Sequence, residues 1–244
     1  MEKCKLCEIN LADKKNSHTI PKFFGKTMLR QNDNKFSGYK ISLTHESTNL
    51  SPKKIQDIHK EDYIFCSTCE SNLSKIETTF SNQIYNKLKH LKRELSDGEF
   101  AFSKIPINHF LDIKLLVYSV IWRANLNQIK YPESFLNENI VKKLRSSIFY
   151  ENIEDNIQVW IAYCPENNPI DNIIHIVQNE NFSILFLNEI IVFTSFNNSR
   201  HPLFFPNHLA LNQKDCSIIL FSKLEWESIR ISILKESFKW LNDK

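Results

Sequence analysis

The stretch CKLCEINLADKKNSHTIPKFF (residues 4–24) contains a C-x-x-C pair and then a histidine, His18. A second C-x-x-C pair follows after a gap of 58 residues. The two pairs supply four cysteines, namely Cys4, Cys7, Cys66 and Cys69. Tetrahedral zinc binds sets of four thiolates, and the short spacing lets each pair hold one ion. The sequence therefore predicts a structural Zn²⁺ site at these four residues, with no need of His18 as a ligand.

The gap between the two pairs is longer than the roughly 15–20 residues of a simple zinc ribbon. We expect the intervening chain to form its own hairpin or loop and to return. A redox dithiol, an iron–sulfur cluster or an incidental pairing are the alternatives. Two separate pairs would be redundant for a dithiol, and nothing else in the sequence indicates redox chemistry.

The overall composition is typical of a globular protein, with 42% hydrophobic and 24% charged residues. Only three glycines occur, which excludes the glycine-rich nucleotide cradles of the P-loop and Rossmann kinds. The two remaining cysteines, Cys164 and Cys216, adjoin the apolar runs VWIAY and SIILF. We expect both to be reduced structural residues, since stable disulfides are rare in the cytosol.

No apolar run approaches the roughly 20 residues that span a bilayer, and the N-terminus has no signal-peptide core. We therefore expect a cytoplasmic protein with no membrane partner. The net charge is +3, but residues 1–60 contain twelve Lys and Arg against six Asp and Glu. Such an excess suits a phosphate-binding face and hence a nucleic-acid partner, although lysine-rich surfaces also serve solubility alone.

The pattern along the chain predicts an α+β protein in two parts. Residues 1–98 form a zinc-binding module that ends in a helix from Cys69 to about Leu95, where apolar residues recur at spacings of three and four. Residues 99–244 form an α+β body. Its predicted elements are helices at about 107–149, strands of a small, mostly antiparallel sheet at about 155–222, and a C-terminal helix at about 225–242.

The segment SHTIPKF (residues 17–23) and the C-x-x-C-E sequence of residues 66–70 lie in an order that resembles zinc-stapled HNH (His-Me finger) nucleases. A closer likeness is to a group of bacterial proteins with an S-H-I-I-P-K-F segment. The resemblance covers about residues 1–80 and, beyond them, the Trp122–Arg123 pair. It implies a ββα module in which a β-hairpin carries the histidine and the next helix supplies metal ligands.

The activity that the resemblance implies is hydrolysis of phosphodiester bonds in DNA or RNA, in the context of bacterial defence against mobile DNA. His18 would be the general base, and Glu70 would bind a catalytic Mg²⁺ or Mn²⁺. HNH enzymes have an Asp or His before the base and a His after the second knuckle. This chain has Ser17 and Glu70 at those positions.

These departures keep two other interpretations open. One is a non-catalytic zinc module that binds nucleic acid or protein, and the other is a zinc staple in a body that binds a protein partner or a second copy of itself. Within them, His18 is a structural residue and Glu70 is a carboxylate favoured by the helix dipole. Glu77 is a surface charge or a partner for a lysine, and Arg123 pairs with a buried carboxylate or carbonyl.

Overall fold

The structure is a computed structural model, and it describes residues 2–28, 30–32, 35–40, 53–56, 60–90, 95–96, 101–104, 109–126, 136–154, 156–164, 174–178, 180–196, 210–211 and 217–242. Within these residues the chain forms helices, one six-stranded sheet and two smaller sheets. The predicted α+β class is therefore confirmed. None of the described helices has the length and apolar content to cross a membrane.

The N-terminal part contains the two smaller sheets. One pairs β1 with β5 in antiparallel register, and the other has the order β2-β3-β4. The chain between the two cysteine pairs thus forms its own strands and then returns, as the long gap predicted. The bounds of these elements are β1 (Ser17–His18), α1 (Lys22–Met28), β2 (Arg30–Asn32), β3 (Lys35–Lys40), β4 (Lys53–Ile55) and β5 (Lys60–Glu61).

The helical segment after the second cysteine pair is not one regular helix, contrary to the prediction. A π-helical turn interrupts it, so its parts are α2 (Ser67–Phe80), η1 (Ser81–Tyr85) and α3 (Asn86–Lys89). The wider turn shifts the side chains that follow it around the axis. Tyr85, at the end of the turn, donates a hydrogen bond to Glu189 of the body at 3.0 Å. The turn therefore lies where the helical segment meets the sheet.

Two helices of the body pack against each other. The first, α4 (Phe110–Leu126), is buried at every position from Ile113 to Arg123, which its nearly continuous apolar sequence explains. The second, α5 (Glu138–Tyr150), is amphipathic and begins at Asn137. The Asn137 side chain accepts a hydrogen bond from the backbone N–H of Asn139, which satisfies a donor of the first helical turn.

The large sheet has the strand order β6-β11-β7-β10-β9-β8. All its pairs are antiparallel except β11 with β7, so the predicted mostly antiparallel sheet is confirmed. Asn188 adopts a left-handed conformation (φ 62°) in the turn between β9 and β10, as a tight hairpin requires. The strands are β6 (Ala101–Lys104), β7 (Gln158–Tyr163), β8 (Ile174–Gln178), β9 (Phe182–Leu187), β10 (Ile190–Ser195) and β11 (Ser217–Leu220).

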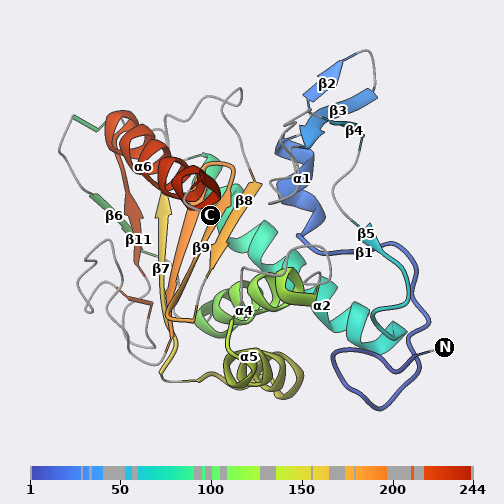
Figure 1. The fold of residues 1–244 in the computed structure, drawn as a ribbon. Coiled ribbons are helices and arrows are strands. Elements are labelled where there is room, and N and C mark those ends of the chain that lie inside the picture. Colours follow the sequence, from blue (N-terminus) through green and yellow to red (C-terminus); the bar gives the residue numbers. More distant parts are fainter. Residues whose placement is uncertain are drawn as a thin grey trace.

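Helices cover both faces of this sheet (Figure 1). Successive side chains of a strand point to opposite faces. On β7, Val159 and Ile161 belong to the core cluster that contains α4, whereas Trp160 packs in a second cluster with Trp226. Trp226 lies on the C-terminal helix α6 (Lys223–Asn242), which Figure 1 shows against the sheet on the side away from α4.

The larger of the two core clusters is continuous from the N-terminal cysteines to the sheet. It includes Cys4, Leu6 and Cys7 together with most of the buried residues of α4. The division at residue 98 stays a prediction, and the core itself does not stop there. Cys164 is buried and is not part of a disulfide, as expected, whereas Cys216 lies outside the described residues.

Candidate metal centre

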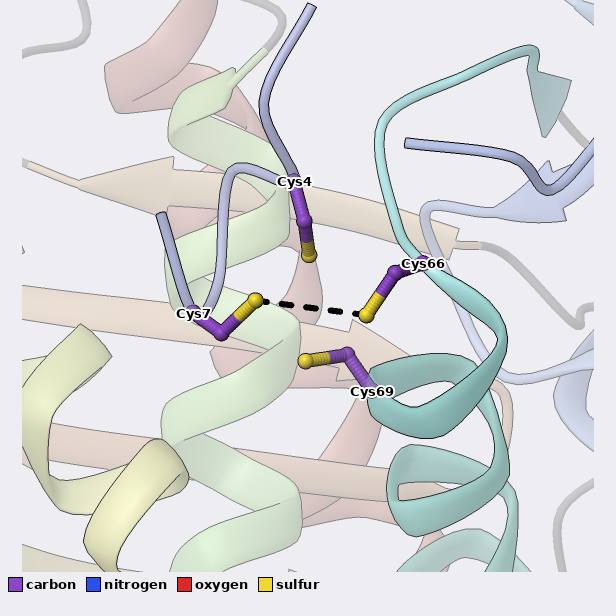
Figure 2. A group of neighbouring side chains, drawn as sticks. All are labelled: Cys4, Cys7, Cys66 and Cys69. Carbon is purple, nitrogen blue, oxygen red and sulfur yellow. Dashed lines mark hydrogen bonds between the residues drawn. The ribbon is translucent and has the colours of Figure 1, made fainter. Parts of the chain in front are cut away.

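The sulfur atoms of the four predicted cysteines converge on one point. Figure 2 shows two of them coming from the N-terminal loop and two from the start of α2. Their Sγ atoms all lie within 4.8 Å of one another, and those of Cys7 and Cys66 are 3.9 Å apart. A tetrahedral zinc with bonds of about 2.3 Å places its sulfurs about 3.8 Å apart. The cluster can therefore hold a metal ion such as zinc.

The first cysteine pair lies on a short turn closed by main-chain hydrogen bonds. The N–H of Glu8 donates to the carbonyl of Cys4 at 2.9 Å, and the N–H of Cys4 donates to the carbonyl of Asn10 at 2.8 Å. Glu8 has a positive φ of 57°, so the chain reverses there. This turn directs both thiols of the pair toward the second pair.

The second cysteine pair is placed by α2. Cys66 is the N-cap residue of this helix, and Cys69 lies in its first turn. The carboxylate of Asp13 accepts hydrogen bonds from the backbone N–H and the hydroxyl of Ser67, at 2.7 and 2.6 Å. Asp13 thereby caps the helix from the other half of the site, which supplies the acceptor that a helix N-terminus needs.

Main-chain hydrogen bonds join the segment around the first cysteine pair to the segment just before the second pair. The N–H groups of Lys5 and Lys14 donate to the carbonyls of Ile64 and Phe65 at 2.9 and 3.0 Å, and the N–H of Tyr63 donates to Lys14 at 2.6 Å. Because backbone groups alone make these bonds, the register between the halves does not depend on side-chain type. The four thiols are consequently brought together by the fold.

The surroundings shift the pKa values of these thiols in different directions. Burial raises the pKa of Cys7, but N–H groups of Asn10 and Ile9 and the thiols of Cys4 and Cys69 outweigh it and lower the pKa to about 7. Burial is the main cause that raises the pKa values of Cys4 and Cys69. Metals bind the thiolate form, so a cation at this site would displace protons from these two buried thiols.

The predicted catalytic residues lie on the elements next to the cysteines. His18 is opposite Lys60 in the β1–β5 pair, and Glu70 is in the first turn of α2. The hydroxyl of Ser17 donates a hydrogen bond to Oε2 of Glu70 at 2.9 Å. His18 is half-buried, and its Nε2 atom is buried. β1 and the start of α2 are therefore in direct contact.

A second contact joins β1 to α2 through α4. The guanidinium of Arg123 donates to the main-chain carbonyl of His18 at 2.9 Å and pairs with Oε1 of Glu77 at 2.8 Å. This confirms that Arg123 pairs with a carboxylate and a carbonyl. The neighbouring Trp122 is a core residue, 1% exposed. The expectation that Glu77 is a surface charge or a lysine partner is wrong, because its partner is this buried arginine.

A shallow groove of about 580 Å³ follows the outer face of α2 and includes Glu70. Its other lining residues are mostly hydroxyl-bearing and include two lysines: Lys14, Ser67, Ser71, Ser74, Lys75, Thr78 and Thr79. The groove gives Glu70 an opening to solvent. A polyanion in it would meet two positive charges and a row of hydroxyl donors.

Among the described residues, the four cysteines are the only group of three or more metal-ligating side chains that lie together. Glu70 and His18 therefore belong to no such group within the part of the chain that the structure describes. No protein-family model matches the chain, and neither a curated protein nor a solved structure matches it.

The sequence did not reveal how the body holds the first cysteine pair. Arg145 of α5 pairs with Glu8 at 2.6 Å and donates to the carbonyl of Leu6 at 3.4 Å. The residues are far apart in the sequence, and no local pattern distinguishes Arg145 from any other basic residue of an amphipathic helix. The only signal was its position on the polar side of α5.

Proposed function

We propose that the protein is an HNH-like, metal-dependent nuclease that acts on DNA or RNA in the cytoplasm, in defence against mobile DNA. The order of the parts supports this proposal. Strand β1 carries His18, β5 pairs with it in antiparallel register, and α2 follows directly. The four cysteines link the loop before β1 to the start of α2. The resemblance to HNH nucleases implies a β-hairpin followed by a helix. Here α1 and the strands β2, β3 and β4 lie between β1 and β5 in the chain, so the pair is not a simple hairpin.

The cysteine cluster has a structural role in this proposal. We assign Zn²⁺ to it, because four thiolates suit zinc and leave no open position for a substrate. The bound zinc fixes the loop before β1 against the first turn of α2. It thereby holds His18 and Glu70 on neighbouring elements without taking part in the chemistry.

The contact between Ser17 and Glu70 is the observation that carries the catalytic assignment. It places the residue before His18 within 2.9 Å of a carboxylate that lines an open groove. Oxygen ligands suit Mg²⁺ and Mn²⁺, which retain several waters and often bind through only one or two carboxylates together with substrate phosphates. Glu70 alone therefore fits such an ion, with a phosphate of the nucleic acid as a further ligand.

In the proposed reaction, the imidazole of His18 takes a proton from a water molecule as the water oxygen attacks phosphorus. The bond from phosphorus to the leaving-group oxygen breaks, and that oxygen takes a proton from solvent. Because Nε2 is buried, we assign the proton-accepting role to Nδ1. The divalent ion supplies positive charge that stabilises the phosphate and the leaving oxygen.

A second function is supported by the same residues. Ser17 is a poor metal ligand at a position where HNH enzymes carry Asp or His, and one oxygen of Glu70 already accepts the Ser17 hydrogen bond. These features favour a non-catalytic zinc module that binds nucleic acid through the groove on α2. A module of this kind would also suit a protein partner or a second copy of the chain.

The test combines cleavage and binding on the zinc-loaded protein. Plasmid DNA and single-stranded RNA are incubated with the wild type and with His18→Ala and Glu70→Gln, in Mg²⁺ or Mn²⁺. For the nuclease we expect cleavage that His18→Ala abolishes at unchanged nucleic-acid affinity, while Glu70→Gln raises the metal concentration required. Binding without cleavage under both metals would contradict the nuclease and support the binding module.

A further inference from the structure

Arg123 is a buried charge near the site with partners on three segments of the chain. Its side chain is 3% exposed, and it projects from the last turn of α4. Besides the bonds to His18 and Glu77, its Nε donates to the carbonyl of Ser119 at 3.2 Å and its Nη2 donates to the Ser119 hydroxyl at 3.1 Å. Four of the five N–H donors of the guanidinium are therefore accounted for.

The two bonds to residues outside α4 start from one nitrogen. Nη1 of Arg123 reaches both the carbonyl of His18 and Oε1 of Glu77. Because a guanidinium is rigid and planar, these two acceptors have a fixed separation as long as both bonds hold. The main chain of His18 is thus fixed relative to α2 as well as to α4.

The contact of Ser17 with Glu70 is the other tie between β1 and α2. Glu70 and Glu77 are seven residues apart on the helix, so their positions differ by roughly 10 Å along its axis. Two consecutive residues of β1 are therefore attached, directly or through Arg123, at two separate heights of α2. Two such attachments oppose both sliding and rotation of the strand, which a single hydrogen bond would allow.

We propose that Arg123 is the positioning residue for His18: its ion pair with Glu77 and its bond to the His18 carbonyl fix the main chain that carries the imidazole relative to α2 and α4. The proposal rests on the proposed nuclease function for its catalytic consequence. The placement of His18 can be measured without any substrate. Arg123 contacts neither the nucleic acid nor the ion in this account, and acts through His18 alone.

Lysine cannot replace arginine here. Its ammonium is a single point of charge, and it cannot present several donors in a fixed plane. Arg123→Lys keeps the charge and most of the buried stem but loses the shared Nη1 contact. We expect the His18 main chain to lose its fixed distance from Glu77, while the core around Trp122 remains.

Arg145 provides a matched control. It also projects from a helix of the body, pairs with a carboxylate of the N-terminal part (Glu8) and donates to a main-chain carbonyl (Leu6). Arg145→Lys makes the same chemical change at a site with no contact to His18. Glu77→Gln is a second variant, which removes the charge from the Arg123 contact and keeps its size.

The experiment uses zinc-loaded full-length protein with labelled histidine, and the His18 signals are assigned with His18→Ala. We expect Arg123→Lys to shift the His18 imidazole signals and its titration curve, and Glu77→Gln to shift them less. The signals of His90, at the end of α3, serve as an internal reference. Arg145→Lys leaves His18 unchanged. In cleavage assays we expect Arg123→Lys to lower kcat about 10- to 100-fold at constant KM, which is the cost of a misplaced catalytic group.

Unchanged His18 signals in folded, zinc-loaded Arg123→Lys would overturn the positioning role, and so would an equal change in Arg145→Lys. If Arg123→Lys fails to fold, Glu77→Gln decides by the same signals, with a shift in support and no shift against. If the wild type cleaves no nucleic acid, the proposed function fails. The His18 signals then still decide the positioning role, so the two failures are distinguishable.

Discussion

The hydroxyl of Ser17 and Oε2 of Glu70 are 2.9 Å apart across the contact between β1 and α2. Ser17 is 1% exposed, so its hydroxyl has little access to water. A buried hydroxyl without a hydrogen bond would lower the stability of the fold by about 1–3 kcal/mol. The Glu70 carboxylate avoids this cost because it accepts the hydrogen bond. The pair therefore ties His18 to the helix and also occupies one oxygen of the proposed metal ligand.

Replacing Ser17 tests whether this position is beside an ion site. We expect Ser17→Asp to lower the stability of the zinc-loaded protein by about 1–3 kcal/mol, because it places a buried carboxylate next to the negative charge of Glu70. Millimolar Mn²⁺ should restore most of this loss, since the two carboxylates can then share an ion. Thermal unfolding with and without Mn²⁺ measures the effect. Ser17→Asn, which has the same size and no charge, should show no response to Mn²⁺, and an equal response in both variants would argue against the site.

The cysteine cluster predicts one zinc ion per chain. We expect Cys66→Ser to lose this zinc and to unfold at lower temperature, because zinc that binds only the folded state contributes its binding free energy to folding. Elemental analysis and thermal unfolding measure the two effects. Cys164→Ser is the matched control, since Cys164 is a buried cysteine outside the cluster and in no disulfide. Full zinc content in Cys66→Ser would contradict the assignment.

The affinity for zinc should depend on pH. The pKa values of Cys4 and Cys69 are raised by burial, so both thiols are protonated at neutral pH in the metal-free protein and must release their protons when zinc binds. Raised pKa values favour the proton at low pH, so the affinity falls on acidification. Each proton released corresponds to about a tenfold change per pH unit. Competition with a chromophoric chelator should show that the zinc affinity rises at least about a hundredfold from pH 6 to pH 7. A zinc affinity that does not change with pH would contradict this prediction.

The groove along α2 should contribute to nucleic-acid binding through Lys14 and Lys75, which line it together with Glu70. We expect the double variant Lys14→Gln/Lys75→Gln to bind duplex DNA more weakly and with less dependence on salt. Each lost phosphate contact lowers the slope of log affinity against log salt by about 0.9. Lys142→Gln on α5, an exposed lysine outside the groove, is the control. An unchanged slope in the double variant would place the DNA elsewhere.

Much of the fold follows from patterns that the chain displays locally. The C-x-x-C pairs predicted the cysteine cluster, because short spacing and four soft ligands are chemical requirements of one tetrahedral ion. The central helix α4 and the strands from β7 to β11 follow from apolar runs, since residues buried on both sides need no polar alternation. The Asn188 turn follows from the tolerance of asparagine for the left-handed conformation.

The parts that the sequence did not predict depend on contacts between distant segments. The edge strand β6 is short and includes polar residues, so it has no pattern that distinguishes it from a loop. The prediction that Glu77 is a surface charge or a lysine partner follows from helix-surface patterns, which consider only neighbours three or four residues away. Its partner, Arg123, comes from another helix. The π-helical turn likewise occurs in a stretch whose apolar spacing is regular.

The central claim is that His18 and Glu70 lie beside one divalent ion, and a measurement of that ion needs no knowledge of the substrate. Mn²⁺ is paramagnetic and broadens the signals of nearby nuclei, so it can be titrated into the zinc-loaded protein while the histidine signals are recorded. His90 is twenty residues from Glu70 along the helical segment, roughly 30 Å, and is the reference. We expect the His18 imidazole signals of the wild type to broaden first, and this broadening to vanish in Glu70→Gln while His90 stays sharp in both. Sharp His18 signals in the wild type, or equal broadening in Glu70→Gln, would contradict the account.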